Sequence, residues 1–314
     1  MPRLRWLRSR RPTPQHLNKQ ASPVIAFGVA CLGIATFSCM DAIMKQVSIH
    51  IGTYNAMLWR SFVGLALSAP LFLIWGVKWP ERSRAILHLK RSAAAGISVL
   101  LFFWGLVRVP MAEGIALSFL SPIIALLLAA PMLGEKVGKS AVGACLLAFS
   151  GVIVIVLGKA HEGGGAAALH GAIAIIIAGV FYAYNLVLLR RSALLAGPIE
   201  ITFFTNLVFA GLYLLGSPIG ASLLPLRWLP LIAAAAGLAI VSSLLLAWAY
   251  ARAEAQRLVP VEFTAFIWAA ILGAIVFGEK VLPLTILGAA MIVAGCVIAA
   301  RAHHAPVPST EAAS

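Results

Sequence analysis

Three charged residues lie inside long runs of apolar residues, and their side chains suit the binding of a small charged molecule. They are Asp41, Arg60 and Glu262. An arginine binds a carboxylate through two parallel N–H groups, whereas a carboxylate accepts hydrogen bonds from an ammonium group or takes a proton. A charged group at the centre of a membrane-spanning helix costs on the order of 2.5–3.5 kcal/mol, so each of the three requires a structural or functional reason.

Asp41 and Arg60 are expected in the same half of the bilayer on neighbouring helices, which leaves two interpretations open. The two side chains pair and neutralise each other, or Arg60 forms a gate or a clamp for a substrate carboxylate. Glu262 enters from the opposite half, so we do not expect it to contact Arg60. It follows Pro260 in the first turn of its segment, where the helix dipole favours a negative charge. The alternative is that Glu262 faces a cavity and binds an ammonium group or a proton.

Hydroxyl, amide and aromatic side chains within the apolar runs form a second group of candidates. Ser118 and Ser121 place hydroxyls beside Pro122, where a kink is expected, although hydroxyls in helices commonly bond to their own backbone. Asn206 requires a partner near the membrane centre, either a neighbouring helix or a substrate. Five aromatic side chains either line a cavity or serve as packing and interfacial groups. They are Trp104, Tyr182, Trp248, Phe263 and Trp268.

The remaining motifs argue against several other classes of protein. The four cysteines contain no CxxC pair, and no His/Cys cluster has the spacing of metal ligands. No Gly-rich phosphate-binding loop or nucleotide motif occurs. The formal net charge is +14, but Lys and Arg lie in short clusters between apolar runs, which fits the loops of a membrane protein better than a nucleic-acid-binding surface. We therefore expect no catalytic centre, no metal and no cofactor.

The elements that carry the candidate residues are membrane-spanning helices. Of the 314 residues, 61% are hydrophobic and 11% are charged, against roughly 25% charged residues in a soluble domain. A span needs about 20 apolar residues, and continuous apolar runs favour helices over a β-barrel. The sequence predicts an all-α protein with ten spans. They run approximately over 22–44, 54–77, 92–109, 112–132, 138–158, 167–188, 198–217, 229–251, 257–277 and 282–300.

The distribution of Lys and Arg sets the expected orientation. With the N-terminus in the cytoplasm, cytoplasmic segments hold 18 of the 24 basic residues and the opposite side holds five. Basic residues concentrate in cytoplasmic loops, so both termini are expected in the cytoplasm.

The chain contains two copies of one unit at a constant offset of 144 residues. The matching pairs are Phe37 with Phe181, Trp104 with Trp248, Arg108 with Arg252, Gly-Glu-Lys at 134–136 with 278–280, and Gly151 with Gly295. Each copy holds five spans, an odd number, so the copies are expected in opposite orientations, as in many secondary transporters. The predicted divisions are a basic tail at 1–21, the first repeat at 22–158, an outer linker at 159–166, the second repeat at 167–302 and a disordered tail at 303–314.

Agreement between the copies suggests scaffold, and disagreement suggests function. In Gly-Glu-Lys the glycine is expected to end a helix in a left-handed conformation and the glutamate to begin the next helix. Small residues on the fifth and tenth spans predict close helix packing within the protomer or between protomers. The positions that differ are candidates for substrate handling and gating. They are Asp41 against Asn185, Arg60 against Phe204, and Ser118 against Glu262.

These features resemble the drug/metabolite transporter superfamily, in particular its EamA-type members. The resemblance rests on the ten spans in two inverted repeats, the Gly-Glu-Lys turns after the fourth and ninth spans, and Arg60 near the start of the second span. It covers about residues 22–302. It implies a basket of helices around a central cavity, alternating access, and peripheral fifth and tenth helices. Within the superfamily the chain is similar to bacterial amino-acid and metabolite exporters.

The expected function is export of a small polar metabolite, above all an amino acid, across the bacterial inner membrane. Few carboxylates are expected inside the spans, which favours facilitated efflux or exchange over proton coupling, for which Glu262 is the one good candidate. The alternatives are an uptake carrier for a cofactor such as S-adenosylmethionine or riboflavin, a membrane-embedded lipid enzyme, and a non-transporting scaffold. A homodimer through the fifth or tenth helix is a further open expectation.

Overall fold

The computed structural model describes residues 23–76, 79–133, 139–161, 165–250 and 261–302, and these residues form helices joined by short turns without any strand. The two terminal tails, the first Gly-Glu-Lys turn, Arg252 and Pro260 lie outside the described residues. The helices are α1 Pro23–Ile51, α2 Thr53–Ile74, α3 Arg82–Leu106, α4 Met111–Ser118, α5 Leu120–Leu133, α6 Lys139–His161, α7 Ala166–Leu195, α8 Pro198–Leu215, α9 Ser217–Gly220, α10 Leu229–Tyr250, α12 Thr264–Phe277 and α13 Pro283–Ala302.

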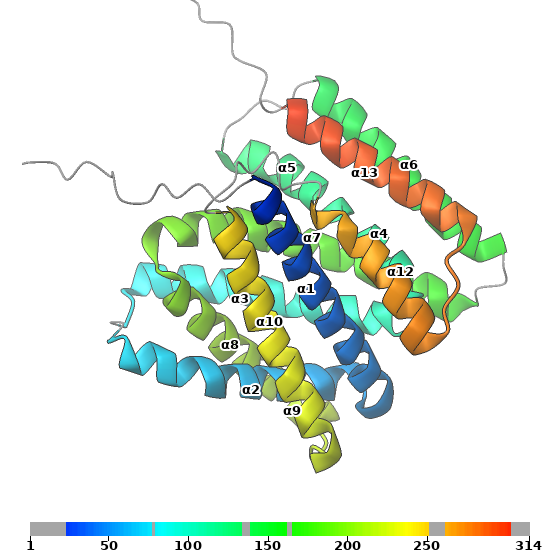
Figure 1. The fold of residues 1–314 in the computed structure, drawn as a ribbon. Coiled ribbons are helices and arrows are strands. Elements are labelled where there is room, and N and C mark those ends of the chain that lie inside the picture. Colours follow the sequence, from blue (N-terminus) through cyan, green and yellow to red (C-terminus); the bar gives the residue numbers. More distant parts are fainter. Residues whose placement is uncertain (1–22, 77–78, 134–138, 162–164, 251–260, 303–314) are drawn as a thin grey trace, which may run out of the picture.

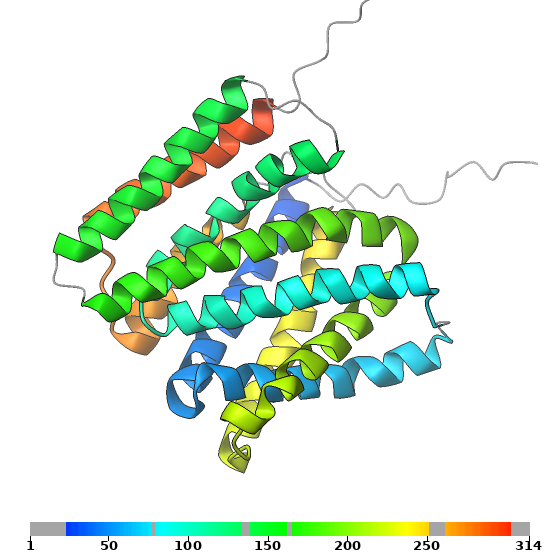
Figure 2. The ribbon, with the colours of Figure 1, turned by 180° about the vertical axis from the view of Figure 1, so that it is seen from behind.

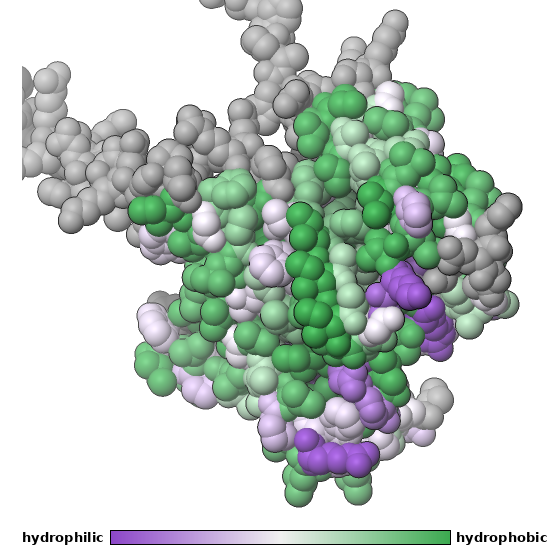
Figure 3. Space-filling view, turned by 45° about the vertical axis from the view of Figure 1, so that its right-hand side comes forward, coloured by the Kyte–Doolittle hydropathy of each residue, from purple (hydrophilic) through white to green (hydrophobic). Residues whose placement is uncertain are grey.

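Five of the helices are long and apolar enough to cross a membrane. They lie at Ile25–Ile51, Thr53–Ile74, Arg82–Leu106, Ala166–Leu189 and Leu226–Leu246. Five shorter apolar helices lie at Met111–Ala125, Val142–Gly158, Ile199–Leu215, Thr264–Phe277 and Pro283–Ile298. All ten regions overlap the expected spans, while the number of membrane crossings stays a prediction. Figure 3 shows a largely apolar surface on the face it presents, as a protein solvated by lipid requires.

Two of the helices that extend beyond their expected ends bury charged or polar residues in the added turns. Helix α1 continues to Ile51 and α3 begins at Arg82, so Lys45, His88 and Arg91 lie within helices and are buried. Their expected placement in loops or at span ends was wrong. Hydropathy ends a predicted span at the first charge, but Lys and Arg are good helix formers and continue the helix. Tertiary contacts then bury the polar side of the added turns.

The helices pack in side-by-side pairs. Helix α1 lies along α10, α3 along α7, α2 along α8, and α6 along α13 (Figures 1 and 2). The α6–α13 pair lies at one edge of the bundle (Figure 1). Its small residues permit the contact, since a Cβ on Gly151 would lie 2.6 Å from the carbonyl oxygen of Gly288. These small faces therefore pack within the protomer, and a homodimer through α6 or α13 would have to use their other faces.

Helices α4 and α5 form one apolar region that is broken at Phe119. Pro122 has no N–H to donate to the carbonyl of Ser118, which ends the regular helix there. The kink expected from Pro122 is thus present as a break between α4 and α5.

Candidate functional site

Four of the predicted site residues come from different parts of the bundle and interact electrostatically. Asp41 in α1 is buried and senses the charge of Arg60 in α2. Tyr182 in α7 senses both Asp41 and Glu262, which lies just before α12. We call these four residues the central charged group. Asp41 and Arg60 belong to the first half of the chain, and Tyr182 and Glu262 belong to the second.

Asp41 and Arg60 interact through space rather than by direct contact. Of the ion pairs within the described part of the chain, none joins these two side chains, although each appears in the electrostatic surroundings of the other. The direct pair expected as one interpretation is therefore absent from the described part of the chain.

Two of the predicted site residues, Ser118 and Phe263, lie where helices of the two halves are interrupted. Phe119 ends α4 and Phe263 precedes α12, and their rings make an edge-to-face contact at 5.3 Å between centroids. The hydroxyl of Ser118 donates to the carbonyl of Ile115 at 2.7 Å. The Ser118 hydroxyl thus bonds to its own helix, as hydroxyls in helices commonly do.

Ser121 and Asn206 both lie at helix–helix contacts. Ser121 is buried, and its Oγ lies 3.1 Å from the place of a Cβ on Gly179 of α7. The amide of Asn206 in α8 donates to Ser68 Oγ of α2 at 3.4 Å and to the carbonyl of Thr202 at 3.1 Å. The amide therefore joins α8 to α2, which is the helix-joining role that was one of its two interpretations.

The three tryptophans have two kinds of surroundings. Trp104 is partly exposed, with the guanidinium of Arg108 lying 3.5 Å above its ring, an arrangement typical of the membrane–water interface. Trp248 and Trp268 pack against the buried cluster around Ala30 of α1. They join α1 to α10 and α12.

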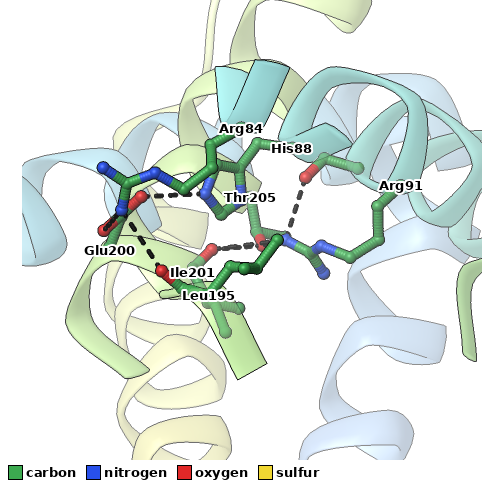
Figure 4. Close-up of polar contacts among 8 residues, drawn as sticks. Arg84, His88, Arg91, Leu195, Glu200, Ile201 and Thr205 are labelled. Atoms are coloured by element: carbon green, nitrogen blue, oxygen red, sulfur yellow. Dashed lines mark hydrogen bonds and ion pairs between the residues drawn. The ribbon is translucent and has the colours of Figure 1, made fainter. Parts of the chain in front are cut away.

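A polar cluster that the sequence did not reveal lies between α3, α7 and α8 (Figure 4). We call it the α3–α8 cluster. Its members are Arg84, His88, Arg91, Asn185, Glu200 and Thr205. At one end, Glu200 accepts from His88 at 3.1 Å and lies 3.7 Å from Arg84. The Arg84 guanidinium also donates to the carbonyl of Leu195, so these contacts join the beginning of α3 to the turn between α7 and α8.

Arg91 occupies the deeper end of the α3–α8 cluster, with only 4% of its surface exposed. It donates to Thr205 Oγ1 at 2.5 Å and to Asn185 Oδ1 at 3.5 Å. Further contacts reach Ser92 Oγ at 3.1 Å and the carbonyl of Ile201 at 3.4 Å. Every one of these acceptors is uncharged.

A second unexpected contact lies near the C-terminal end of α1. The ammonium of Lys45 pairs with Glu279 at 2.5 Å and donates to the carbonyl of Val109 at 2.9 Å. The other carboxylate oxygen of Glu279 accepts from the backbone N–H of Met111, the first residue of α4, at 2.6 Å. Gly278 ends α12 with φ of 65°, as expected. Glu279 does not begin the following helix, since α13 starts at Pro283, and instead caps α4.

The missed residues share one cause. Arg91, His88 and Lys45 lie next to other polar residues at the ends of apolar runs, where a hydropathy criterion assigns them to loops. The signal that could have found them is helical spacing, because residues 84, 88 and 91 recur at intervals of four and three and so share one face of a helix.

The architecture defines a helical membrane protein with charged and polar groups held between its helices. Among the described residues no group of three or more His, Cys, Asp and Glu side chains is placed to hold a metal ion. The model of the EamA-like transporter family matches residues 24–157 and again 169–301. The chain belongs to this family, and it is a membrane transporter rather than an enzyme.

Several relatives are themselves named as transporters. The pseudopaline exporter CntI of Pseudomonas aeruginosa is 24% identical over 87% of this chain and 95% of its own length. An uncharacterized transporter of Helicobacter pylori is 25% identical over 88% of this chain and 95% of its own. A riboflavin transporter of Brucella anthropi is 31% identical over 31% of this chain and 34% of its own. One crystal structure aligns with 91% of this chain at a TM-score of 0.58 and 18% identity, and supports the fold alone.

Proposed function

We propose that the protein exports a small polar metabolite, in the first place an amino acid, across the bacterial inner membrane by alternating access between its two repeats. The observation that carries the proposal is the central charged group, in which Asp41 lies within electrostatic range of Arg60, and Tyr182 within range of Asp41 and Glu262. Ionisable side chains inside a transporter mark substrate or ion pathways. An amino acid carries both an ammonium group and a carboxylate, which such a group of mixed charge suits.

The pattern of helix contacts supports the inverted repeat that alternating access requires. Exchanging the two halves turns the α1–α10 pair into the α7–α3 pair, and it turns the α2–α8 and α6–α13 pairs into themselves. Single contacts follow the same rule. A Cβ on Gly151 would meet the carbonyl of Gly288 at 2.6 Å, and one on Gly295 would meet the carbonyl of Ala144 at 2.7 Å. Phe119 and Phe263, also 144 residues apart, contact each other, as residues close to a two-fold axis do.

The orientation of the repeats predicts opposite exposure of the two Gly-Glu-Lys turns. In a variant without the four native cysteines, Lys280→Cys is expected to react with a membrane-impermeant maleimide in intact spheroplasts. Lys136→Cys, at the equivalent place in the first repeat, is expected to react only after lysis. Equal labelling of both positions from the outside would contradict the inverted repeat and the cytoplasmic termini.

Transport is tested with purified protein in proteoliposomes loaded with radiolabelled amino acids. Three carboxylates are buried among the described residues, namely those of Asp41, Glu113 and Glu200. We expect efflux or exchange that a pH gradient changes little, because Glu200 is held by Arg84 and His88, and Asp41 lies near the charge of Arg60. Glu262→Gln tests this point, and Glu81→Gln, at an exposed carboxylate outside the central charged group, serves as its control. If flux depended strongly on the gradient and Glu262→Gln removed that dependence, the carrier would be proton-coupled.

A second candidate function is uptake of a cofactor such as riboflavin. The observation that favours it is the segment of 98 residues that is 31% identical to a riboflavin transporter. A thermal-shift screen of the purified protein against amino acids, nucleosides and vitamins separates the two functions. Stabilisation by riboflavin alone would replace the amino-acid proposal.

A further inference from the structure

Arg91 is a buried cation whose surroundings lack a matching negative charge. We infer that Arg91 binds the carboxylate of the transported molecule, with Asn185 and Thr205 as its positioning partners. The inference rests on the proposed function of the protein as a carrier and names the chemical group that its substrate must have. It is argued from three features of the α3–α8 cluster.

The first feature is the set of hydrogen bonds around Arg91. The guanidinium contacts four oxygen atoms, and all four belong to hydroxyl, amide or backbone groups. Its Nε is buried without a hydrogen-bond partner in the structure. An arginine presents five N–H donors that fit a carboxylate in bidentate fashion. Burial of a charge is costly without an opposite charge, so Arg91 is arranged to gain from an anionic ligand.

The second feature is the commitment of the neighbouring carboxylate elsewhere. Glu200 contacts His88 at 3.1 Å and Arg84 at 3.7 Å, and no ion pair of the described residues includes Arg91. Figure 4 shows Glu200 directed toward Arg84 and His88, with Arg91 reaching Thr205 from the other side. The α3–α8 cluster therefore separates into a closed ion-paired end and a deeper cationic end.

The third feature is a difference between the two halves of the chain. Asn185, which accepts from Arg91, stands 144 residues after Asp41, whose carboxylate interacts with Arg60. Arg60 and Arg91 both belong to the first repeat and are not equivalent positions, but each interacts with one member of this equivalent pair. Arg60 has the carboxylate of Asp41 in its surroundings, whereas Arg91 has the amide of Asn185, which brings no negative charge and leaves the charge of Arg91 to be matched by a carboxylate of the substrate.

Access to Arg91 is closed in this structure, because its side chain is buried. Separation of α3 from the turn between α7 and α8 would break the Arg84 contacts with Leu195 and Glu200. Such a step exposes Arg91 on one side of the membrane only, as alternating access demands.

The test crosses a change in the protein with a change in the substrate. Proteoliposome flux is measured for each transported amino acid and for its carboxamide, using wild type, Arg91→Gln and the control Arg84→Gln. We expect wild type and Arg84→Gln to prefer the acid by roughly 10-fold or more, the range of a charge-assisted hydrogen bond, and Arg91→Gln to lose most of this preference. If Arg91 only joins helices, Arg91→Gln will lower flux of acid and amide by the same factor, which overturns the inference.

Asn185→Asp gives a second test, in which thermal stability is kept or raised while transport of the acid is lost. The new carboxylate would pair with Arg91 and compete with the carboxylate of the substrate. We expect unchanged or higher thermal stability together with at least about a tenfold loss of acid flux. Full transport of the acid by this variant would contradict the inference.

The two proposals fail in different ways. If wild-type proteoliposomes carry no compound from a panel of amino acids, other carboxylates, nucleosides and vitamins, the proposed transport function fails. If they carry only compounds without a carboxylate, such as riboflavin, the protein is a carrier and the inference about Arg91 is wrong.

Discussion

Replacement of Lys45 with methionine is expected to lower the free energy of unfolding by about 3 kcal/mol or more, the usual cost of removing one partner of a buried ion pair. Lys45 has 3% of its side chain exposed and lies 2.5 Å from Glu279. It also donates to the carbonyl of Val109, directly before the turn into α4. Methionine fills the same space without either interaction, so the carboxylate of Glu279 loses its countercharge.

The effect should reach beyond the pair itself, because Glu279 also caps α4. Its bond to the N–H of Met111 at 2.6 Å satisfies a helix N-terminal donor that has no partner within the helix. Lys45 and Glu279 thus tie α1 and the turn after α12 to the turn before α4. We expect Lys45→Met to lose thermal stability in detergent and to lose transport.

Lys280→Met is the matched control, because Lys280 is adjacent to Glu279 and exposed. It removes the same charge and is expected to change the free energy of unfolding by no more than a surface substitution does, about 0.5 kcal/mol. The double variant Lys45→Met/Glu279→Gln should recover part of the loss, since neither charge is then left alone. Equal stability of Lys45→Met and Lys280→Met would show that the ion pair of Lys45 with Glu279 does not stabilise the fold.

The centres of the helices could be predicted from the sequence, but their ends could not. Apolar runs of span length locate α2, α7 and α10 directly. The ends of α1 and α3 depend on whether another helix buries their polar turns, and α8 buries His88 through Glu200. The spacing of residues 84, 88 and 91 indicates that they share one face of a helix, but it does not indicate which other helix buries that face.

The candidate site divides in the same way. Asp41, Arg60 and Glu262 were predictable because a charge inside an apolar run is conspicuous. In the structure Asp41 is buried within range of the charge of Arg60, while Glu262 is exposed and within range of Tyr182. The hydropathy criterion places Arg91 outside the spans, although its partner Asn185 is one of the positions at which the repeats differ. The comparison of the repeats identifies Asn185, but only the packing of α3 against α7 shows that Arg91 is its partner.

Agreement between the repeats predicts scaffold positions, and Gly151 is the sharpest case. Gly151→Ala is expected to destabilise the α6–α13 pair, because the added Cβ would lie 2.6 Å from the carbonyl oxygen of Gly288 and 2.9 Å from Ile292. A backbone carbonyl in a helix cannot turn aside, so the two helices must separate. Overpacking of this kind costs about 1–3 kcal/mol.

Gly143→Ala makes the same change two turns earlier in α6, where an added Cβ meets nothing within 4 Å. Alanine is favoured over glycine in a helix by about 1 kcal/mol, so this variant should be as stable as wild type or more stable. The two variants are compared by thermal unfolding in one detergent. Similar unfolding temperatures for Gly151→Ala and Gly143→Ala would contradict the close approach of α6 and α13.

The equivalent glycine of the second repeat extends the argument. Gly295→Ala would place its Cβ 2.7 Å from the carbonyl oxygen of Ala144, so we expect a loss similar to that of Gly151→Ala. Both clashes are relieved by the same separation of α6 from α13, and the double variant should therefore lose less than the sum of the single losses. Since neither glycine belongs to the central charged group or to the α3–α8 cluster, the folded fraction of each variant should keep its transport rate.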